Sequence, residues 1–165
     1  MKTIDKIQVL DWLSKKEFLG SNNNFLIPDF DFSYHFEITK DSGTKTSISR
    51  ELGALIKNYS GESLLWINEY GIWPSCEDVN LFTGFRKSIG EKESVYMKPG
   101  HLFQTEDIDN IQSIIAMVLY FVWGAIILTE PKDMVIRISH DEYITIYSKE
   151  DINVSRIKDI CETNN

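Results

Sequence analysis

The chain has 165 residues, the length of one ordinary domain, and 42% of them are hydrophobic, 25% charged and 12% aromatic. These values lie near globular averages and exclude a disordered, collagen-like or disulfide-scaffold chain. The 17 basic and 25 acidic residues give a formal charge of −8. Because non-specific nucleic-acid binding depends on basic groups that neutralise phosphates, we expect no nucleic-acid partner. A basic protein surface is the natural complement of this charge.

Hydrophobic spacing predicts alternating helices and strands along the first hundred residues. Glycine, proline and capping residues mark the expected ends of these helices and strands. In chain order we expect a helix capped by Thr3 and ended by Gly20, an extended region over 25–39, a helix between the turn 41–44 and Ser60-Gly61, a strand over 63–68, a helix capped by Ser75 and ended by Gly90, and strands over 95–97 and 102–104 around Pro99-Gly100.

A long uncharged stretch follows at 110–129, and 114–128 is nearly continuous apolar sequence. A membrane-spanning helix needs about 20 predominantly apolar residues. Gln112, Ser113 and Gly124 interrupt this stretch, its flanks are acidic, and no Lys/Arg cluster adjoins it, so we expect no membrane partner. The better interpretation is a buried helix that leads into a buried strand at 125–128.

The end of the chain has two segments of period-two alternation, 134–139 and 143–147, which predict an antiparallel hairpin joined by His140-Asp141-Glu142. Ser148 with Asp151 is expected to cap a final helix. The order of elements predicts an α/β fold, with residues 1–165 forming a single globular domain. We expect a layered sandwich with a mixed β-sheet, helices on both faces and the C-terminal antiparallel hairpin.

The sequence indicates no metal and no cofactor. Its two cysteines, Cys76 and Cys161, are far apart, and its three histidines lack the short spacings of zinc ligands. The segment 43–46 lacks the glycine that a phosphate-binding loop needs before its lysine, so a helix cap explains it better. Charged residues interrupt the apolar pattern of 1–13, which removes the core of a signal peptide. We therefore expect a cytoplasmic protein with reduced thiols.

The acidic excess is concentrated in the last third of the chain. Residues 1–100 are nearly balanced, whereas residues 101–165 hold five basic and eleven acidic groups. One interpretation is that these acids start helices, form turns and keep the protein soluble. The other is an acidic recognition face. The turn His140-Asp141-Glu142 has a similar pair of interpretations, ordinary turn chemistry or an exposed acidic contact with a carboxylate-oriented histidine.

The most unusual segment, 66–77, follows a predicted strand and leads into a helix, where open α/β sheets often place binding sites. Its aromatic residues, including Trp73, are either core side chains or a ligand platform. Its carboxylates suggest a polar pocket built with more distant residues. The candidate catalytic residues are Glu69, Glu77, Arg86 and His101. For His101, which follows Pro99-Gly100, a structural role in a turn is the alternative.

The chain resembles a family of small stand-alone bacterial proteins that has no established activity. The resemblance covers roughly residues 36–147 and assigns no role to any residue. It rests on Asp41-Ser42-Gly43 with Lys45, Leu64-Leu65-Trp66-Ile67, Gly71-Ile72-Trp73-Pro74-Ser75 with Glu77, Arg86 with Ser88 and Gly90, Pro99-Gly100-His101-Leu102-Phe103, and Ser139-His140-Asp141-Glu142.

Two functional hypotheses follow from the sequence. The first is a small binding protein, such as an immunity protein that neutralises a basic toxin or nuclease, with Trp73, His140, Asp141 and Glu142 as contact residues. The second is a small hydrolase or transferase in which a carboxylate of the pocket acts as general base and His101 as acid or orienting group. The absence of a catalytic signature in the sequence favours the first.

Overall fold

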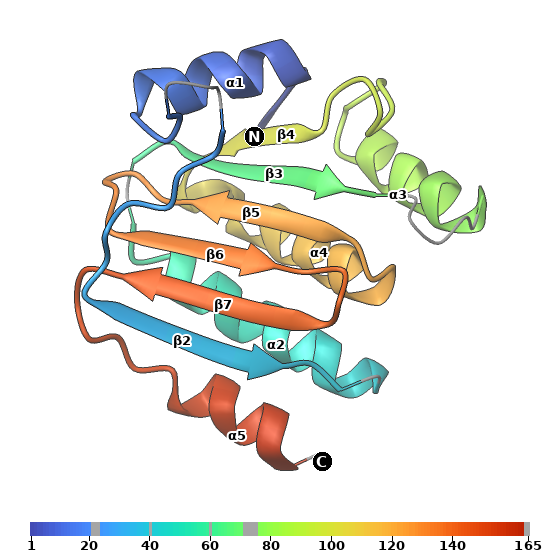
Figure 1. The fold of residues 1–165 in the computed structure, drawn as a ribbon. Coiled ribbons are helices and arrows are strands. Elements are labelled where there is room, and N and C mark those ends of the chain that lie inside the picture. The colour runs from blue at the N-terminus through green and yellow to red at the C-terminus, as the bar shows by residue number, and fades with distance from the viewer. Residues whose placement is uncertain (21–23, 40, 60, 71–75, 164–165) are drawn as a thin grey trace.

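The computed structural model describes residues 1–20, 24–39, 41–59, 61–70 and 76–163, with the backbone alone at 76–79. These residues form strands and helices that alternate along most of the chain (Figure 1). The elements are β1 (Lys2–Ile4), α1 (Lys6–Lys15), β2 (Phe32–Glu37), α2 (Ser42–Ile56), β3 (Ser63–Glu69), α3 (Cys76–Ser88), β4 (Gly100–Phe103), the short 3-10 helix η1 (Thr105–Asp107), α4 (Ile108–Tyr120), β5 (Gly124–Leu128), β6 (Met134–Ile138), β7 (Tyr143–Ser148) and α5 (Ser155–Thr163).

The strands form one open sheet with the order β1-β4-β3-β5-β6-β7-β2. Every neighbouring pair is antiparallel, so the α/β class is confirmed whereas the expectation of a mixed sheet is wrong. Helical crossovers do join strands that run in the same direction, as α4 does between β4 and β5. Those strands are not neighbours, because β3 lies between them. The alternation of helices and strands along the sequence does not show that a third strand lies between the two that a helix joins.

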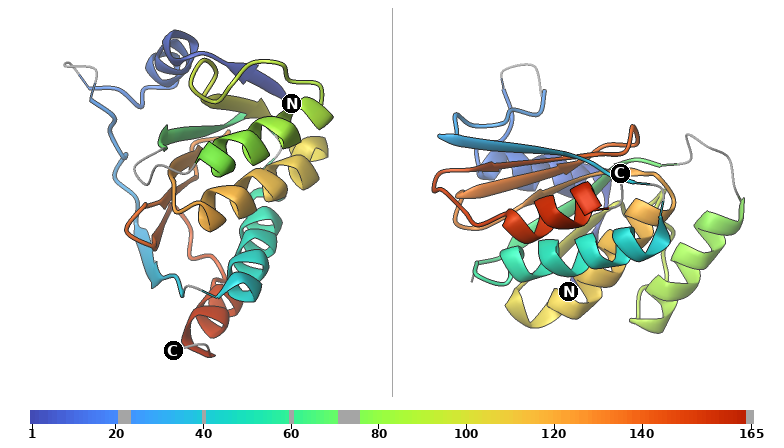
Figure 2. Two further views of the ribbon diagram at one scale, coloured as in Figure 1. Left: turned by 90° about the vertical axis from the view of Figure 1, so that its right-hand side faces the viewer. Right: turned by 90° about the horizontal axis from the view of Figure 1, so that it is seen from below.

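Helices cover both faces of the sheet, as expected, and the coverage is uneven. On one face, α2, α3, α4 and α5 pack against a large apolar cluster that includes Ile48, Ile115 and Ile127 (Figure 2). On the other face, α1 and the segment that follows it cover a smaller cluster around Leu64 and Leu128. This second layer leaves the part of the sheet near the β6–β7 hairpin uncovered.

Local capping explains where the first two helices begin. The side chain of Asp5 accepts a hydrogen bond from the Gln8 amide, and that of Asp41 accepts one from the Thr44 amide. The cap predicted at Thr3 is wrong, because Thr3 lies in β1 opposite His101. Tertiary pairing therefore takes the residues before Asp5 into the sheet, although their apolar spacing also fits a helix.

Three further boundaries differ from the sequence prediction. Residues 95–97 form a turn rather than a strand, with the Met97 amide donating to the Ser94 carbonyl over 3.1 Å. Pro99-Gly100 leads directly into β4, so the expected turn there is also wrong. Ser148 ends β7 instead of capping the final helix, which begins at Ser155.

The uncharged stretch divides into α4 and β5, as predicted. The five residues of β5 are all buried, and α4 buries Ile111, Ile114 and Val118 against the sheet. Among the described residues, no helix combines the length and the apolar composition needed to cross a membrane.

The same substitution at two glycines tests how tightly the layers are packed. A Cβ at Gly100 in β4 would lie 2.5 Å from Val9 Cγ2 of α1 and 2.7 Å from Ile4 Cγ1 of β1, both of them buried. Gly100→Ala should lower the free energy of unfolding by about 1–3 kcal/mol, because that interior has no room for a methyl group. Gly84→Ala, in α3 with nothing within 4 Å, should raise it by about 0.5–1 kcal/mol. Urea unfolding measures both, and a Gly100→Ala protein as stable as the wild type would contradict the packing.

Candidate functional site

The hairpin end of the sheet gathers most of the polar residues that the sequence singled out. We use this name for the end of β2 at Glu37, the end of β3 at Glu69, the start of β5 at Gly124, and the turn 139–142 (Figure 1, right side). The N-terminus of α2, with Asp41 and Lys45, adjoins it because α2 follows closely after β2. Four segments that are separated in the sequence thus meet at one end of the sheet.

The turn between β6 and β7 has a defined backbone. The Ser139 amide donates to the Tyr143 carbonyl over 2.8 Å, and the Glu142 amide donates to the Ser139 carbonyl over 3.1 Å. Glu142 has a positive φ of 64°, the left-handed conformation that usually favours glycine or asparagine. The Ile38 amide also donates to the Glu142 carbonyl over 2.8 Å. This bond joins the turn to the chain leaving β2 and helps to hold the strained residue.

A nearly buried ion pair fixes the Glu142 side chain. The Lys45 side chain is only 7% exposed, and its Nζ lies 3.4 Å from Glu142 Oε1. The Asp41 cap sets the start of α2 and so places Lys45 one turn later, beneath the hairpin. The cavity beside this pair, which Trp123 and Ser139 also line, measures about 10 Å³. That volume suits one water molecule and not a substrate.

His140 lies between two carboxylates. Its Nδ1 is 2.7 Å from Glu69 Oε2, and its Nε2 is 3.4 Å from Asp141 Oδ1. The hydrogen bond to Glu69 is the main cause that raises the pKa of His140, against partial desolvation and the opposing charge of Arg137. The geometry is therefore that of the carboxylate-oriented histidine. Asp141 is 68% exposed and projects furthest of the three.

Glu69 reaches His140 because residue 124 is a glycine. The β3–β5 register shifts between Ile67 and Glu69, which places Glu69 opposite Gly124. A Cβ at position 124 would lie 2.8 Å from Glu69 Cβ and would also collide with the carboxylate. The Glu69 side chain thus lies across the bare Gly124 backbone. Alternation along β5 puts this contact on the α1 face, the face to which Ile126 and Leu128 also point.

The candidate pocket residues are divided between the two faces of the sheet. His101 is opposite Leu65 in β3, and its ring lies 6.2 Å from that of Phe82 in α3. Both therefore lie on the face that carries the larger apolar cluster. Arg86 Cζ lies 5.8 Å from the same Phe82 ring, so Arg86 and His101 are together. Glu69 is on the opposite face with His140. The side chain of Glu77 and all of Trp73 lie outside the described residues.

Sequence reasoning missed the partner of Glu69 and the surface beside it. His35 in β2 stacks on Tyr143 with ring centroids 4.9 Å apart, and its Nδ1 lies 3.1 Å from Thr145 Oγ1. Arg137 is exposed next to them on β6 and contributes to the field at His140. Period-two alternation predicted the two hairpin strands that carry Arg137 and Tyr143. Only the strand order shows that they share one uncovered patch with Glu69.

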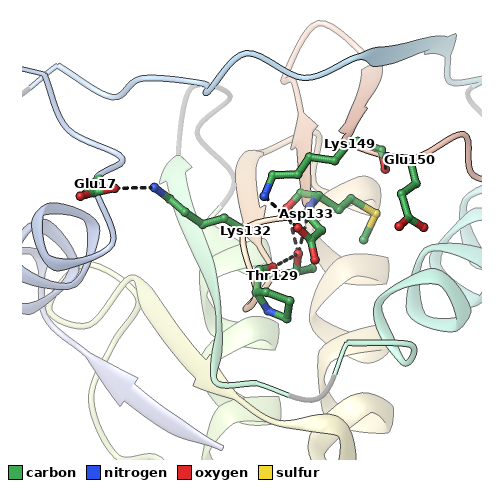
Figure 3. Close-up of polar contacts among 9 residues, drawn as sticks. Glu17, Thr129, Lys132, Asp133, Lys149 and Glu150 are labelled. Carbon is green, nitrogen blue, oxygen red and sulfur yellow. Dashed lines mark hydrogen bonds and ion pairs between the residues drawn. The ribbon is translucent and has the colours of Figure 1, made fainter.

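The acidic last third is divided between the two ends of the sheet, and several of its carboxylates pair with lysines, some from the same third and some from the first part of the chain. At the end opposite the hairpin, Lys149 Nζ lies 3.0 Å from Asp133, and Lys16 Nζ lies 3.0 Å from Glu130 (Figure 3 shows the first pair). Lys132, in the same turn, reaches back to Glu17 over 3.4 Å. The uneven charge along the chain is therefore not one continuous acidic face.

The described side chains do not form a group of three or more His, Cys, Asp or Glu residues that could hold a metal ion. Both ring nitrogens of His140 face carboxylates, so the ring joins the turn to Glu69 of β3 and has no nitrogen directed away from them. Comparisons with protein-family models, curated proteins and solved structures found no match. The resemblance to small bacterial proteins therefore stays a prediction, and the arguments about function rest on this geometry.

The raised pKa of His140 predicts a pH-dependent contribution to stability. Glu69→Gln removes the main cause of the shift, so the pKa of His140 should fall toward its ordinary value of about 6.5. Because the folded-state pKa is raised, the link stabilises fully below about pH 6.5 and is lost as pH rises through the folded pKa. The wild type should therefore exceed Glu69→Gln in stability more at about pH 5.5 than at about pH 8. NMR titration of the His140 ring and urea unfolding at several pH values measure these effects.

Glu37→Gln is the matched control, because it removes one carboxylate from the same end of the sheet without a hydrogen bond to His140. It should leave the titration of His140 close to that of the wild type. An unchanged His140 pKa in Glu69→Gln would contradict the link.

A separate prediction concerns how much the Lys45–Glu142 ion pair contributes to stability. Glu142→Gln leaves the Lys45 ammonium in an almost buried position without its carboxylate, so it should lower the free energy of unfolding by about 1.5–3 kcal/mol. The double variant Lys45→Met/Glu142→Gln removes both charges and should recover much of the loss. Thermal and urea unfolding of the single and double variants test the coupling. Equal loss in Glu142→Gln and the double variant would show that the pair is not coupled.

Proposed function

We propose that the protein is a cytoplasmic binding protein whose hairpin end docks a basic surface of another protein. An immunity protein that neutralises a basic toxin or nuclease is the form of this function that we favour. The observation that supports it best is the acidic turn 139–142, held rigid while Asp141 projects into solvent. Its contact residues would be His140 and Asp141, with Glu142 as the support of the turn.

Rigidity is the first argument for this proposal. The turn is tied to β3 by His140 and Glu69, to α2 by Glu142 and Lys45, and to the end of β2 by the Ile38 amide. A loop that is already ordered loses little conformational entropy when a partner binds. The strained backbone at Glu142 is consistent with a turn kept for its shape.

The surface beside the turn supplies the second argument. His35 and Tyr143 expose a stacked pair of rings on the uncovered part of the sheet, and Arg137 lies near them. Aromatic side chains and arginine are enriched in protein interfaces, whereas a rim of exposed carboxylates provides electrostatic steering toward a basic partner. Asp141 and Glu37 would form that rim.

The hydrolase or transferase alternative has less support from the geometry. Its residues Glu69 and His101 lie on opposite faces of the sheet, and the cavity beside Lys45 is of water size. His140 has a carboxylate at each ring nitrogen, so a substrate would have to displace Asp141 to receive a proton from Nε2.

A charge-reversal experiment tests the proposal. A partner captured by the wild-type protein is purified, and its affinity is measured by calorimetry at several salt concentrations. Asp141→Lys should weaken binding at least about tenfold, since it places a cation against a basic surface. Binding by the wild type should also weaken steeply as salt increases.

Asp159→Lys, on the exposed side of α5, is the control with the same change in net charge. It should change the affinity much less than Asp141→Lys. Equal effects of the two variants, or an affinity that salt does not alter, would remove the hairpin end as the docking surface.

A further inference from the structure

Arg86 and His101 form a buried polar pair that the proposed docking surface does not use. Arg86 lies in the last turn of α3, and His101 lies in β4 between β1 and β3. Both side chains are 0% exposed. They share one aromatic neighbour, Phe82, whose ring is 5.8 Å from Arg86 Cζ and 6.2 Å from the His101 ring. The pair is therefore enclosed between α3 and the sheet.

Among the described residues, none accepts a hydrogen bond from the three guanidinium nitrogens of Arg86. The nearest described carboxylate, Glu91, lies 3.9 Å from one terminal nitrogen, beyond hydrogen-bond range. The other Glu91 oxygen already accepts hydrogen bonds from the Lys92 and Glu93 amides, each over 2.8 Å. Glu91 thus balances part of the charge, and the buried N–H donors stay unsatisfied. Since arginine does not deprotonate in proteins, this charge is permanent.

His101 adds a second set of unsatisfied groups. Its polar neighbour in the sheet is the backbone of Leu65 in β3, whose weak hydrogen bond favours the protonated ring, and neither ring nitrogen has a well-formed hydrogen bond to a described residue. Burial, and then the charge of Arg86, lower the pKa of His101 to about 3, so its ring is neutral near pH 7. A neutral imidazole offers one N–H donor and one acceptor. Because the charge of Arg86 acts on the His101 ring, the two buried groups lie near one another, and neither has its hydrogen-bonding capacity filled.

These groups match the chemistry of a carboxylate. The guanidinium fork pairs with a planar carboxylate through two parallel hydrogen bonds, and the imidazole N–H can add a third. Glu91 and Glu93 already contribute negative charge near Arg86, which favours a monoanion over a dianionic phosphate. The aromatic rings of Phe82 and Trp123, 5.4 Å apart, would border its apolar end.

We propose that Arg86 and His101 bind a small monocarboxylate, which enters when α3 moves away from β4. Movement of α3 is required because both side chains are closed to solvent. The helix is placed for such a movement, since it lies at one end of its layer, with α5 at the other end (Figure 2). It ends in a glycine-based cap in which Gly90 has a φ of 90° and the Glu91 amide donates to the Arg86 carbonyl over 2.9 Å.

The test compares thermal unfolding in sodium chloride, sodium acetate, sodium propionate and sodium phosphate at equal ionic strength. The unfolding temperature of the wild type should rise with acetate or propionate and saturate, by a few degrees, as expected for a ligand of the folded state. Arg86→Met should show no such rise. Arg50→Met, which removes an exposed arginine from α2, should respond like the wild type.

Stability in chloride alone separates the outcomes further. Arg86→Met should be at least as stable as the wild type there, because it removes a buried charge without hydrogen bonds. Titration of acetate into wild-type protein, followed by NMR of the Arg86 Nε–H and the His101 ring, provides a readout that needs no variant. Both signals should shift together. A wild type that carboxylates do not stabilise, an equal response in Arg86→Met, or stabilisation by phosphate alone would overturn the proposal.

Discussion

The structure depends on the burial of β3 and β5 from both sides. All five residues of β5 are buried, and Leu64 and Leu65 of β3 point to opposite apolar clusters. Strands of this kind must be covered twice, because neither face tolerates water. The helices α2 and α4 supply one layer, and α1 with its following segment supplies the other. The second layer is too short to reach β2 and β7 at the hairpin end, and the outward-facing residues of those strands are polar.

Two histidines show how the same side chain takes opposite states in this scaffold. His101 is wholly enclosed beside a cation, so its ring is held neutral. His140 is at the open edge between Glu69 and Asp141, so its charged form is favoured. Only the second is placed where a change in pH or a partner's charge can act on it. The first belongs to the interior, where its unsatisfied nitrogens, together with those of Arg86, mark the proposed carboxylate site.

Tertiary structure also changes the meaning of the charge pattern. The last third of the chain is strongly acidic, yet Asp133, Glu130 and Glu142 each pair with a lysine, two of them from the first 45 residues. The excess that remains is distributed over both ends of the sheet and along α5. What distinguishes the hairpin end is therefore the set of contacts that tie its turn to β3, α2 and the end of β2, together with the exposed Asp141, more than its total charge. Interfaces gain affinity from such preorganised groups rather than from net charge alone.

Local rules in the sequence determined the elements: the cap at Asp41, the period-two strands of the hairpin, and the uncharged stretch that became α4 and β5. These depend on residues within a few positions of one another, which is why they could be predicted. The strand order, the antiparallel pairing throughout and the pairing of Thr3 with His101 depend on contacts between distant segments. For the same reason the sequence grouped Glu69 with His101. Only the tertiary structure placed a glycine at 124 beneath Glu69 and brought His140 across the sheet to meet it, because a shared apolar core decides which strands become neighbours.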